Sequence, residues 1–159
     1  MQSWTLTPEL QERVVALNDV QVRSTGEFVL YWVHHALRVH DNPALDAAAS
    51  IALQLGLPLL VYQGLGGRHR YNADRHHQFI LEAARDFSDQ LASFGQRLLF
   101  HLPQDPMQPG PLGGLLRRSA LVVSELYPVP PFTRWYQSHG KDHPSLPWLL
   151  VDACCILPM

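Results

Sequence analysis

Lysine and cysteine are scarce in this chain of 159 residues, and each shortage excludes a class of function. Lysine occurs once, at Lys141, and the formal net charge is −2. A domain that grips nucleic acid by itself carries a basic stripe for the phosphates, and the sequence shows none. Because of this lack of basic charge, the chain is not expected to hold DNA or RNA alone.

The two cysteines, Cys154 and Cys155, are adjacent, and neighbouring residues rarely reach the geometry of a relaxed disulfide. A fold that depends on disulfides is therefore not expected.

Signals for membranes, metals and common catalytic centres are absent as well. No apolar run approaches the ~20 residues of a transmembrane helix, and the N-terminus lacks a signal-peptide layout, so a cytoplasmic protein without a membrane segment is expected. None of the nine histidines falls in an HExxH pattern, and two cysteines cannot form a thiolate zinc site. The sequence also has no GxSxG elbow and no GxxxxGK[ST] loop. We therefore expect no metal site and assign no catalytic residue.

The length and the 47% hydrophobic share fit one globular domain with a sizeable core. Residues 1–27 form an N-terminal lead-in, with a short helix possible from Pro8 to Leu17 and no strand of the main sheet. Residues 28–159 form the α/β domain. This boundary rests on the first long apolar run, FVLYWV, which begins at Phe28.

Five short apolar runs separated by helical patterns predict an alternation of strands and helices. The predicted strands are residues 28–33, 57–62, 97–102, 120–124 and 148–151. Right-handed crossovers between them give a doubly wound, Rossmann-like parallel sheet of five strands, in the order 3-2-1-4-5, with helices on both faces. The first run is unbroken, which is typical of a strand buried on both faces.

Two helices have clear signals. Residues 43–55 follow the capping pair Asp41-Asn42 and end at Gly56, where a left-handed C-terminal cap is expected. Residues 73–94 carry the apolar stripe of one helical face. The residues of that stripe are Ile80, Ala84, Phe87, Leu91 and Phe94. Shorter helical pieces are predicted at residues 115–118 and 132–138.

Polar residues follow the first and fourth predicted strands, where the strand order reverses. His34, His35 and Arg38 follow the first strand, and Glu125 and Tyr127 follow the fourth. Ligands of open α/β sheets bind at such a reversal, so these five residues are the candidate binding site. One interpretation is a planar or anionic ligand held by Arg38, with Arg38→Ala and Glu125→Ala weakening it in an intact fold. The other is that these residues cap helices and solvate the edge of the sheet.

The amino-acid sequences of several segments resemble those of a known family. Residues 31–32 read YW and residues 37–45 read LRVHDNPAL. The segments RHHQFILE (residues 75–82), PFTRW (131–135) and VDA (151–153) follow in the same order. This pattern resembles the N-terminal α/β domain of DNA photolyases and cryptochromes, and it is most similar to class II deoxyribodipyrimidine photolyases.

The resemblance implies a light-driven carbon–carbon lyase that repairs pyrimidine dimers with reduced flavin. It implies an antenna pigment (a deazaflavin, a folate or a flavin nucleotide) on the α/β domain, with FAD and the DNA groove on a helical domain absent from these residues. We expect this segment to bind the pigment, or to dock on a helical FAD-binding domain in cis or in trans, and not to repair DNA alone. The alternative is a stand-alone nucleotide-binding or structural module of the same fold.

Overall fold

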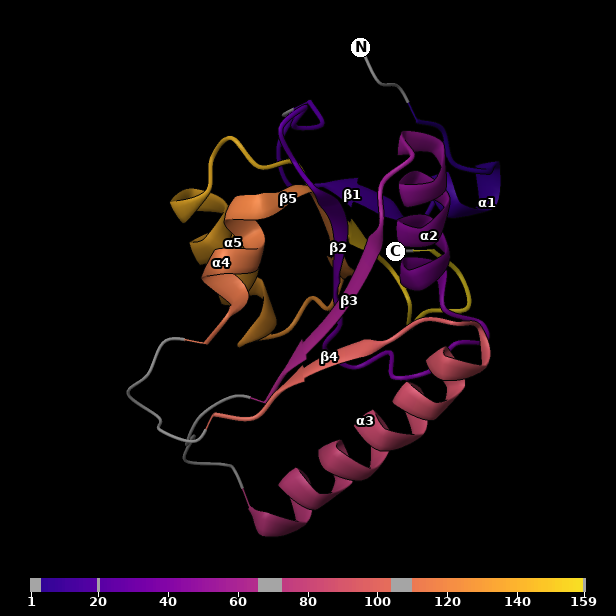
Figure 1. The fold of residues 1–159 in the computed structure, drawn as a ribbon, viewed down its shortest axis with the longest axis vertical. Coiled ribbons are helices and arrows are strands. Elements are labelled where there is room, and N and C mark those ends of the chain that lie inside the picture. Colours follow the sequence, from indigo (N-terminus) through magenta and orange to yellow (C-terminus); the bar gives the residue numbers. More distant parts are fainter. Residues whose placement is uncertain (1–3, 20, 66–72, 104–109, 159) are drawn as a thin grey trace.

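A twisted sheet forms the middle layer of the fold (Figure 1). The computed structural model describes residues 4–19, 21–65, 73–103 and 110–158. Within these residues the sheet has six strands, in the order β1-β6-β5-β2-β3-β4. Their bounds are β1 Val14–Ala16, β2 Phe28–Trp32, β3 Leu59–Gly64, β4 Leu98–His101, β5 Ser119–Glu125 and β6 Trp148–Val151.

The five predicted strands lie parallel and in the predicted order, so the Rossmann-like fold class is confirmed. The strand count is wrong by one. β1, inside the segment predicted to contain no strand, pairs antiparallel with β6, with Val14 opposite Val151. Two backbone hydrogen bonds continue this ladder, from Leu17 N to the Trp148 carbonyl and from Asp152 N to the Arg13 carbonyl.

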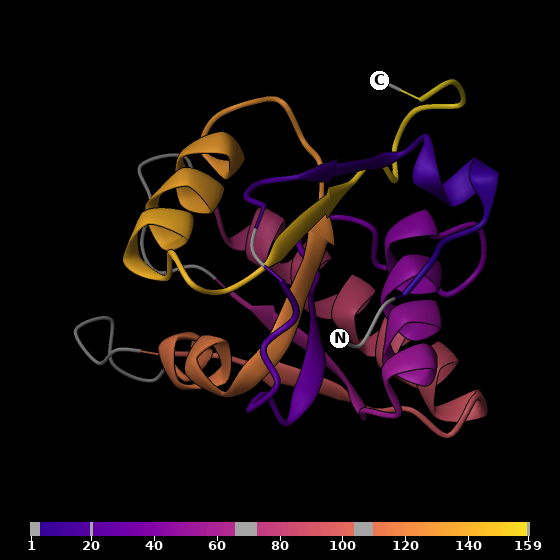
Figure 2. The ribbon, with the colours of Figure 1, turned by 90° about the horizontal axis from the view of Figure 1, so that it is seen from above.

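Helices cover both faces of the sheet (Figure 2). Their bounds are α1 Pro8–Gln11, α2 Pro43–Leu55, α3 Asp74–Ser93, α4 Leu112–Arg118 and α5 Phe132–Asp142. One hydrophobic core lies between the sheet and α2 with α3, and a second lies between the sheet and α4 with α5. None of the helices in the described part of the chain has the length and apolar character needed to cross a membrane.

β2 supplies both cores, because successive side chains of a strand point to opposite faces. Val29 and Tyr31 belong to the core under α2, whereas Leu30 and Trp32 belong to the core under α5. All five residues of β2 are buried. The prediction of a central strand buried on both faces is therefore confirmed.

Local capping chemistry sets the ends of α2 as predicted. Asn42 Oδ1 accepts a hydrogen bond from Leu45 N at 3.1 Å, and Pro43 occupies the first turn, where its missing N–H costs nothing. Gly56 ends the helix in the left-handed region, at φ 65°. The long helix α3 differs slightly from its prediction, because Phe94 lies past its end with 63% of its surface exposed.

Candidate ligand rim at the reversal of strand order

The reversal of strand order lies between β2 and β5, and the structure brings four of the five predicted site residues together there. Glu125 Oε2 accepts a hydrogen bond from His34 N at 2.8 Å. The rings of His35 and Tyr127 lie 4.6 Å apart between centroids. Arg38 instead points toward the segment after β6. We call these five residues the rim.

Glu125 is fully buried and its carboxylate points into the protein rather than toward a ligand. Besides His34 N, it accepts a hydrogen bond from the Tyr31 hydroxyl, at 2.7 Å. Burial raises the pKa of Glu125 to about 7, although the Tyr31 and His34 hydrogen bonds oppose that rise. In this conformation Glu125 fixes the backbone of the rim, and its carboxylate is not available to a ligand.

Asn42 holds the same loop from its other end. This side chain is fully buried, and its Nδ2 donates hydrogen bonds to the carbonyls of Ala36 and Arg38 at 3.0 and 2.9 Å. It also contacts the hydroxyl of Tyr31, at 3.2 Å, which links it to Glu125. The structural role predicted for Asn42 is confirmed, and it extends beyond capping α2.

The ring of His34 is surrounded by aromatic side chains. Its centroid lies 4.4 Å from Trp32, 5.4 Å from Phe132 and 5.8 Å from Trp135. Burial, followed by the nearby His35, lowers the pKa of His34 to about 3. His34 is therefore neutral near pH 7, and its Nε2 is buried with no hydrogen-bond partner among the described residues.

His35 and Cys154 form a neutral pair. His35 Nε2 lies 3.0 Å from Cys154 Sγ. Burial and then the nearby Arg38 lower the pKa of His35 to about 4, while burial and Asp152 raise the pKa of the Cys154 thiol. The second ring nitrogen, Nδ1, has no orienting partner in the described structure. A catalytic Cys–His pair needs an activated thiolate and an oriented base, and this pair has neither.

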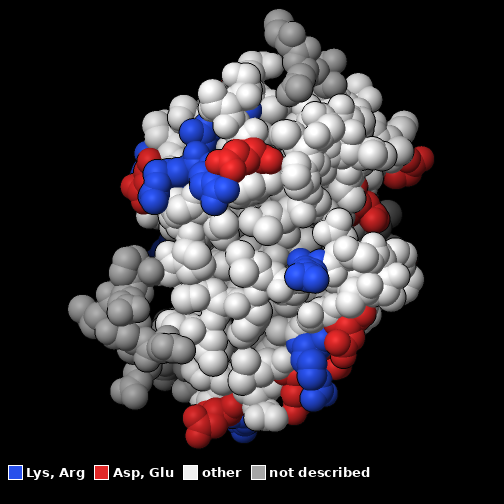
Figure 3. Space-filling view, in the orientation of Figure 1, with Lys and Arg blue, Asp and Glu red and all other residues white. Residues whose placement is uncertain are grey.

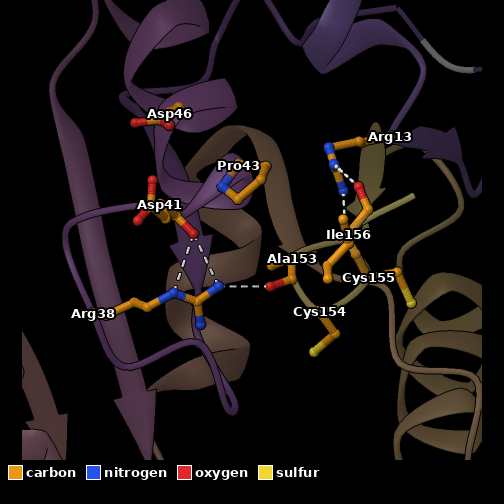
Figure 4. A pocket seen from close by; sticks show the side chains of 9 residues that line it. All are labelled: Arg13, Arg38, Asp41, Pro43, Asp46, Ala153, Cys154, Cys155 and Ile156. Atoms are coloured by element: carbon orange, nitrogen blue, oxygen red, sulfur yellow. Dashed lines mark hydrogen bonds between the residues drawn. The ribbon is translucent and has the colours of Figure 1, made fainter. Parts of the chain in front are cut away.

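Arg38 lines a pocket of about 350 Å³ at the end of β6 (Figure 4). Its guanidinium group donates to the carbonyl of Asp41, at 3.1 and 2.9 Å, and to that of Ala153, at 2.7 Å. Arg13 similarly holds the carbonyls of Cys155 and Ile156. The other lining residues are Pro43, Asp46 and Cys154. Both arginines therefore fix the segment after β6, and the guanidinium group of Arg13 also lies 4.0 Å from the carboxylate of Asp152.

The sequence of residues 29–108, which contains most of β2 and three of the five rim residues, matches the DNA photolyase family. This chain belongs to the DNA photolyase family. The similar curated proteins include a deoxyribodipyrimidine photo-lyase of Methanothermobacter thermautotrophicus, 33% identical over 95 residues that cover 60% of this chain and 21% of that protein. A deoxyribodipyrimidine photo-lyase of Potorous tridactylus is 26% identical over 147 residues, which cover 88% of this chain and 26% of that protein.

A third photolyase, the (6-4)DNA photolyase of Arabidopsis thaliana, is 32% identical over 93 residues. That match covers 52% of this chain and 16% of the Arabidopsis protein. The chain thus spans about a quarter or less of the length of these relatives. The resemblance read from the sequence is confirmed at the level of the family.

Several residues that shape this photolyase-family rim were not found from the sequence. The pattern of β2 predicts Tyr31 only as a buried residue of a strand. Arg13 holds the carbonyls of Cys155 and Ile156, which lie at the other end of the chain, so no local pattern connects them. Phe132 and Trp135 lie in a predicted helix, which gives no indication that they surround His34.

His139 and His143 lie four residues apart near the end of α5. The described residues nevertheless contain no group of three metal-binding side chains.

We expect Arg38→Ala to lower the free energy of unfolding by about 1 kcal/mol, because hydrogen bonds from this guanidinium group to two carbonyls are lost. Urea denaturation followed by far-ultraviolet circular dichroism measures this change. Arg85→Ala is the matched control, since the Arg85 side chain is exposed and its ion pair, with the neighbouring Asp86 at 3.7 Å, is exposed as well. Equal stability of the two variants would show that Arg38 does not anchor the segment after β6.

Proposed function

We propose that this chain is the α/β part of a cytoplasmic, light-driven DNA repair photolyase. In this proposal it works with a helical FAD-binding domain, joined in cis or recruited in trans, and carries an antenna pigment or docks on that domain. The family match over residues 29–108 is the observation that carries the proposal. The relatives named as deoxyribodipyrimidine photo-lyases indicate the substrate class, pyrimidine dimers in DNA.

The charge distribution supports a partner that supplies the DNA contacts. On the face of the molecule seen in Figure 3, lysine and arginine lie in small groups, most of them beside aspartate or glutamate, and form no continuous basic band. Arg118, for example, pairs with Glu27 at 2.6 Å. A repair enzyme needs positive charge along the strand and a pocket for the extruded bases. We therefore propose that DNA is reached only through the helical domain.

The rim has the chemistry that a planar pigment needs. The rings of Tyr127 and His35 already lie 4.6 Å apart, tilted by 43°, and the ring of Phe132 lies 5.2 Å from that of Tyr127. His34 Nε2 and His35 Nδ1 are buried polar atoms without partners among the described residues, and a heteroaromatic ring edge could satisfy them. A deazaflavin, folate or flavin nucleotide supplies blue-light absorption when bound, and the chain's own residues would stack on it and orient it.

The alternative, a stand-alone nucleotide-binding or structural module, has less support. A nucleotide site needs a cation or a glycine cradle for phosphate. Arg38, the cation predicted for that role, donates its hydrogen bonds to the carbonyls of Asp41 and Ala153. The neutral state of His34 and His35 removes two further candidates for holding phosphate, and the same argument makes a flavin nucleotide the least favoured of the three pigments.

The absorption spectrum of the purified protein tests the pigment. We expect a near-ultraviolet or blue band, and we expect Tyr127→Ala to reduce it at least tenfold because a stacking surface is lost. Phe79→Ala is the control, since Phe79 is 67% exposed on α3 and remote from the rim in the sequence. A colourless protein that binds ATP or AMP tightly would overturn the proposal in favour of a nucleotide-binding module.

A further inference from the structure

The two edges of the sheet differ in how well they are protected. β1 forms one edge and has only three residues, so it offers a further strand little to pair with. β4 forms the other edge, next to β3 (Figure 1). Its four residues, LLFH, include no lysine, proline or acidic residue, which commonly protect an exposed edge. Within the described part of the chain, β4 is therefore open to pairing with another strand.

The backbone of β4 presents unpaired groups along this edge. Leu65 N donates a hydrogen bond to the carbonyl of His101, so the backbone groups of His101 point toward β3. These groups alternate along a strand, so Leu98 and Phe100 point their N–H and C=O groups away from β3. Neither residue has a further backbone partner among the described residues. A strand placed alongside β4 would satisfy these groups.

Apolar side chains lie along the same edge. Leu99 is 40% exposed, and Leu102, just past the strand, is 54% exposed. Leu99 pairs with Tyr62 of β3 and lies on the same face of the sheet. Tyr62 belongs to the core under α4 and α5, whereas no described residue of β4 does. The open edge is therefore apolar as well as unpaired.

The helix beside this edge, α3, carries opposite charges on its outer flank. Gln90 accepts a hydrogen bond from Val39 N, so that flank of α3 faces the segment leading into α2. At about 100° per residue, the opposite flank carries Arg85 and Asp89, one helical turn apart. Both residues are exposed. This flank faces outward, past β4.

We propose that β4 pairs antiparallel with the β4 strand of a second copy of this chain, about a two-fold axis at Leu99. In that register Leu98 lies opposite Phe100 of the partner subunit, and the two residues exchange hydrogen bonds through their outward N–H and C=O groups. The two Leu99 side chains meet at the axis. Each copy offers the same surface, as a two-fold dimer requires. The dimer goes beyond the proposed photolyase role and does not depend on it, since it involves no pigment, FAD or DNA.

The charges on α3 favour a second copy over another partner. Gln96 N donates to the carbonyl of Leu91, which ties the end of α3 to the start of β4. Rises of about 1.5 Å per helical residue and 3.3 Å per strand residue then place Leu99 roughly level with Asp89. The axis sets the two α3 helices antiparallel. Arg85 therefore lies about one turn from Asp89 of the partner subunit, and the pair occurs twice.

Sedimentation velocity over about 5–500 µM protein tests the dimer. We expect reversible association to twice the 18.0 kDa mass of the chain. The dissociation constant should be on the order of 10–100 µM, because the contact is small, so dilute samples used for unfolding are monomeric. A chain that stays monomeric throughout this range would overturn the proposal.

Leu99→Lys should raise the dissociation constant at least tenfold, because it places two like charges opposite each other at the axis. Val15→Lys is the matched control at the β1 edge, since Val15 is exposed to a similar extent, and it should leave the constant unchanged. Equal weakening by both variants would overturn the assignment to β4. So would a Leu99→Lys variant that loses binding only to a separately supplied helical FAD-binding domain, because that domain would then be the partner.

Charge exchange on α3 tests the two-fold arrangement. Arg85→Asp and Asp89→Arg should each weaken the dimer about fivefold, because each creates like-charge pairs across the axis. The double variant restores opposite charges and should recover the wild-type dissociation constant. A double variant as weak as the single ones would contradict the antiparallel placement of the two helices.

A disulfide across the axis tests the register. Leu99→Cys, made together with Cys154→Ser and Cys155→Ser, should form a covalent dimer on mild oxidation. Side chains of an antiparallel pair without mutual hydrogen bonds lie close enough for that bond. Val15→Cys in the same background is the control. Cross-linking of Leu99→Cys no greater than that of the control would overturn the register.

Discussion

Phe87→Ala is expected to lower the free energy of unfolding by about 3–5 kcal/mol, enough to unfold a domain of ordinary stability. Phe87 has no exposed surface and lies in the core between α3 and the sheet. Truncation removes its transfer free energy and leaves a cavity that the flanking side chains of Ala84 and Leu91 cannot fill without movement. Urea denaturation, with the midpoint read by circular dichroism, measures the loss.

Phe79→Ala is the matched control for this prediction, because it makes the same chemical change in the same helix. Phe79 is 67% exposed, so its truncation should alter stability by less than about 0.5 kcal/mol. The contrast isolates burial from helix propensity. If both variants lost the same free energy, α3 would not pack on the sheet through the Phe87 face.

Gly26→Ala should cost about 3 kcal/mol, because the new methyl group has no space. A Cβ built at Gly26 would lie 2.1 Å from the Cα and 2.3 Å from the N of Ala120, which is backbone of the central strand β5. Backbone atoms of a central strand cannot move aside as a flexible side chain can. The midpoint of thermal or urea unfolding measures the cost.

Gly113→Ala is the matched control at a glycine with space. Among the described residues, a Cβ there would meet only the Arg117 guanidinium, at 3.6 Å, and the residue lies inside α4, where alanine is the better helix former. We expect this variant to gain up to about 1 kcal/mol. A neutral Gly26→Ala, or a loss of the same size in both variants, would contradict the close approach of residue 26 to β5.

The parts of the fold that depend on local sequence patterns could be predicted. β2 and β5 are continuous apolar runs, and alternation with helices fixes their parallel pairing, so the order of five strands was predictable. The ends of α2 follow from Asn42 and Gly56. β1 was not predictable, because Val14–Ala16 is too short to show a pattern and is a strand only through its pairing with β6.

The rim was predictable in its position but not in its internal arrangement. The reversal of strand order placed His34 near Glu125, and that juxtaposition is seen. The Glu125 carboxylate points inward because it accepts a hydrogen bond from the hydroxyl of Tyr31. The alternation of side chains along β2 predicts only that Tyr31 lies in the hydrophobic core. The earlier expectation that Glu125→Ala leaves the fold intact is accordingly revised, since that change would remove the acceptor of two donors, the Tyr31 hydroxyl and the His34 N–H.

The most direct test of the account is repair by a chimera, in which this chain replaces the matching segment of the Potorous tridactylus photo-lyase. The substrate is an oligonucleotide with one cyclobutane thymine dimer, and repair is measured under blue light and in the dark. We predict light-dependent repair by the chimera and none by the 159-residue chain alone. Repair by the chain alone, or a folded and flavin-loaded chimera that repairs nothing, would contradict it.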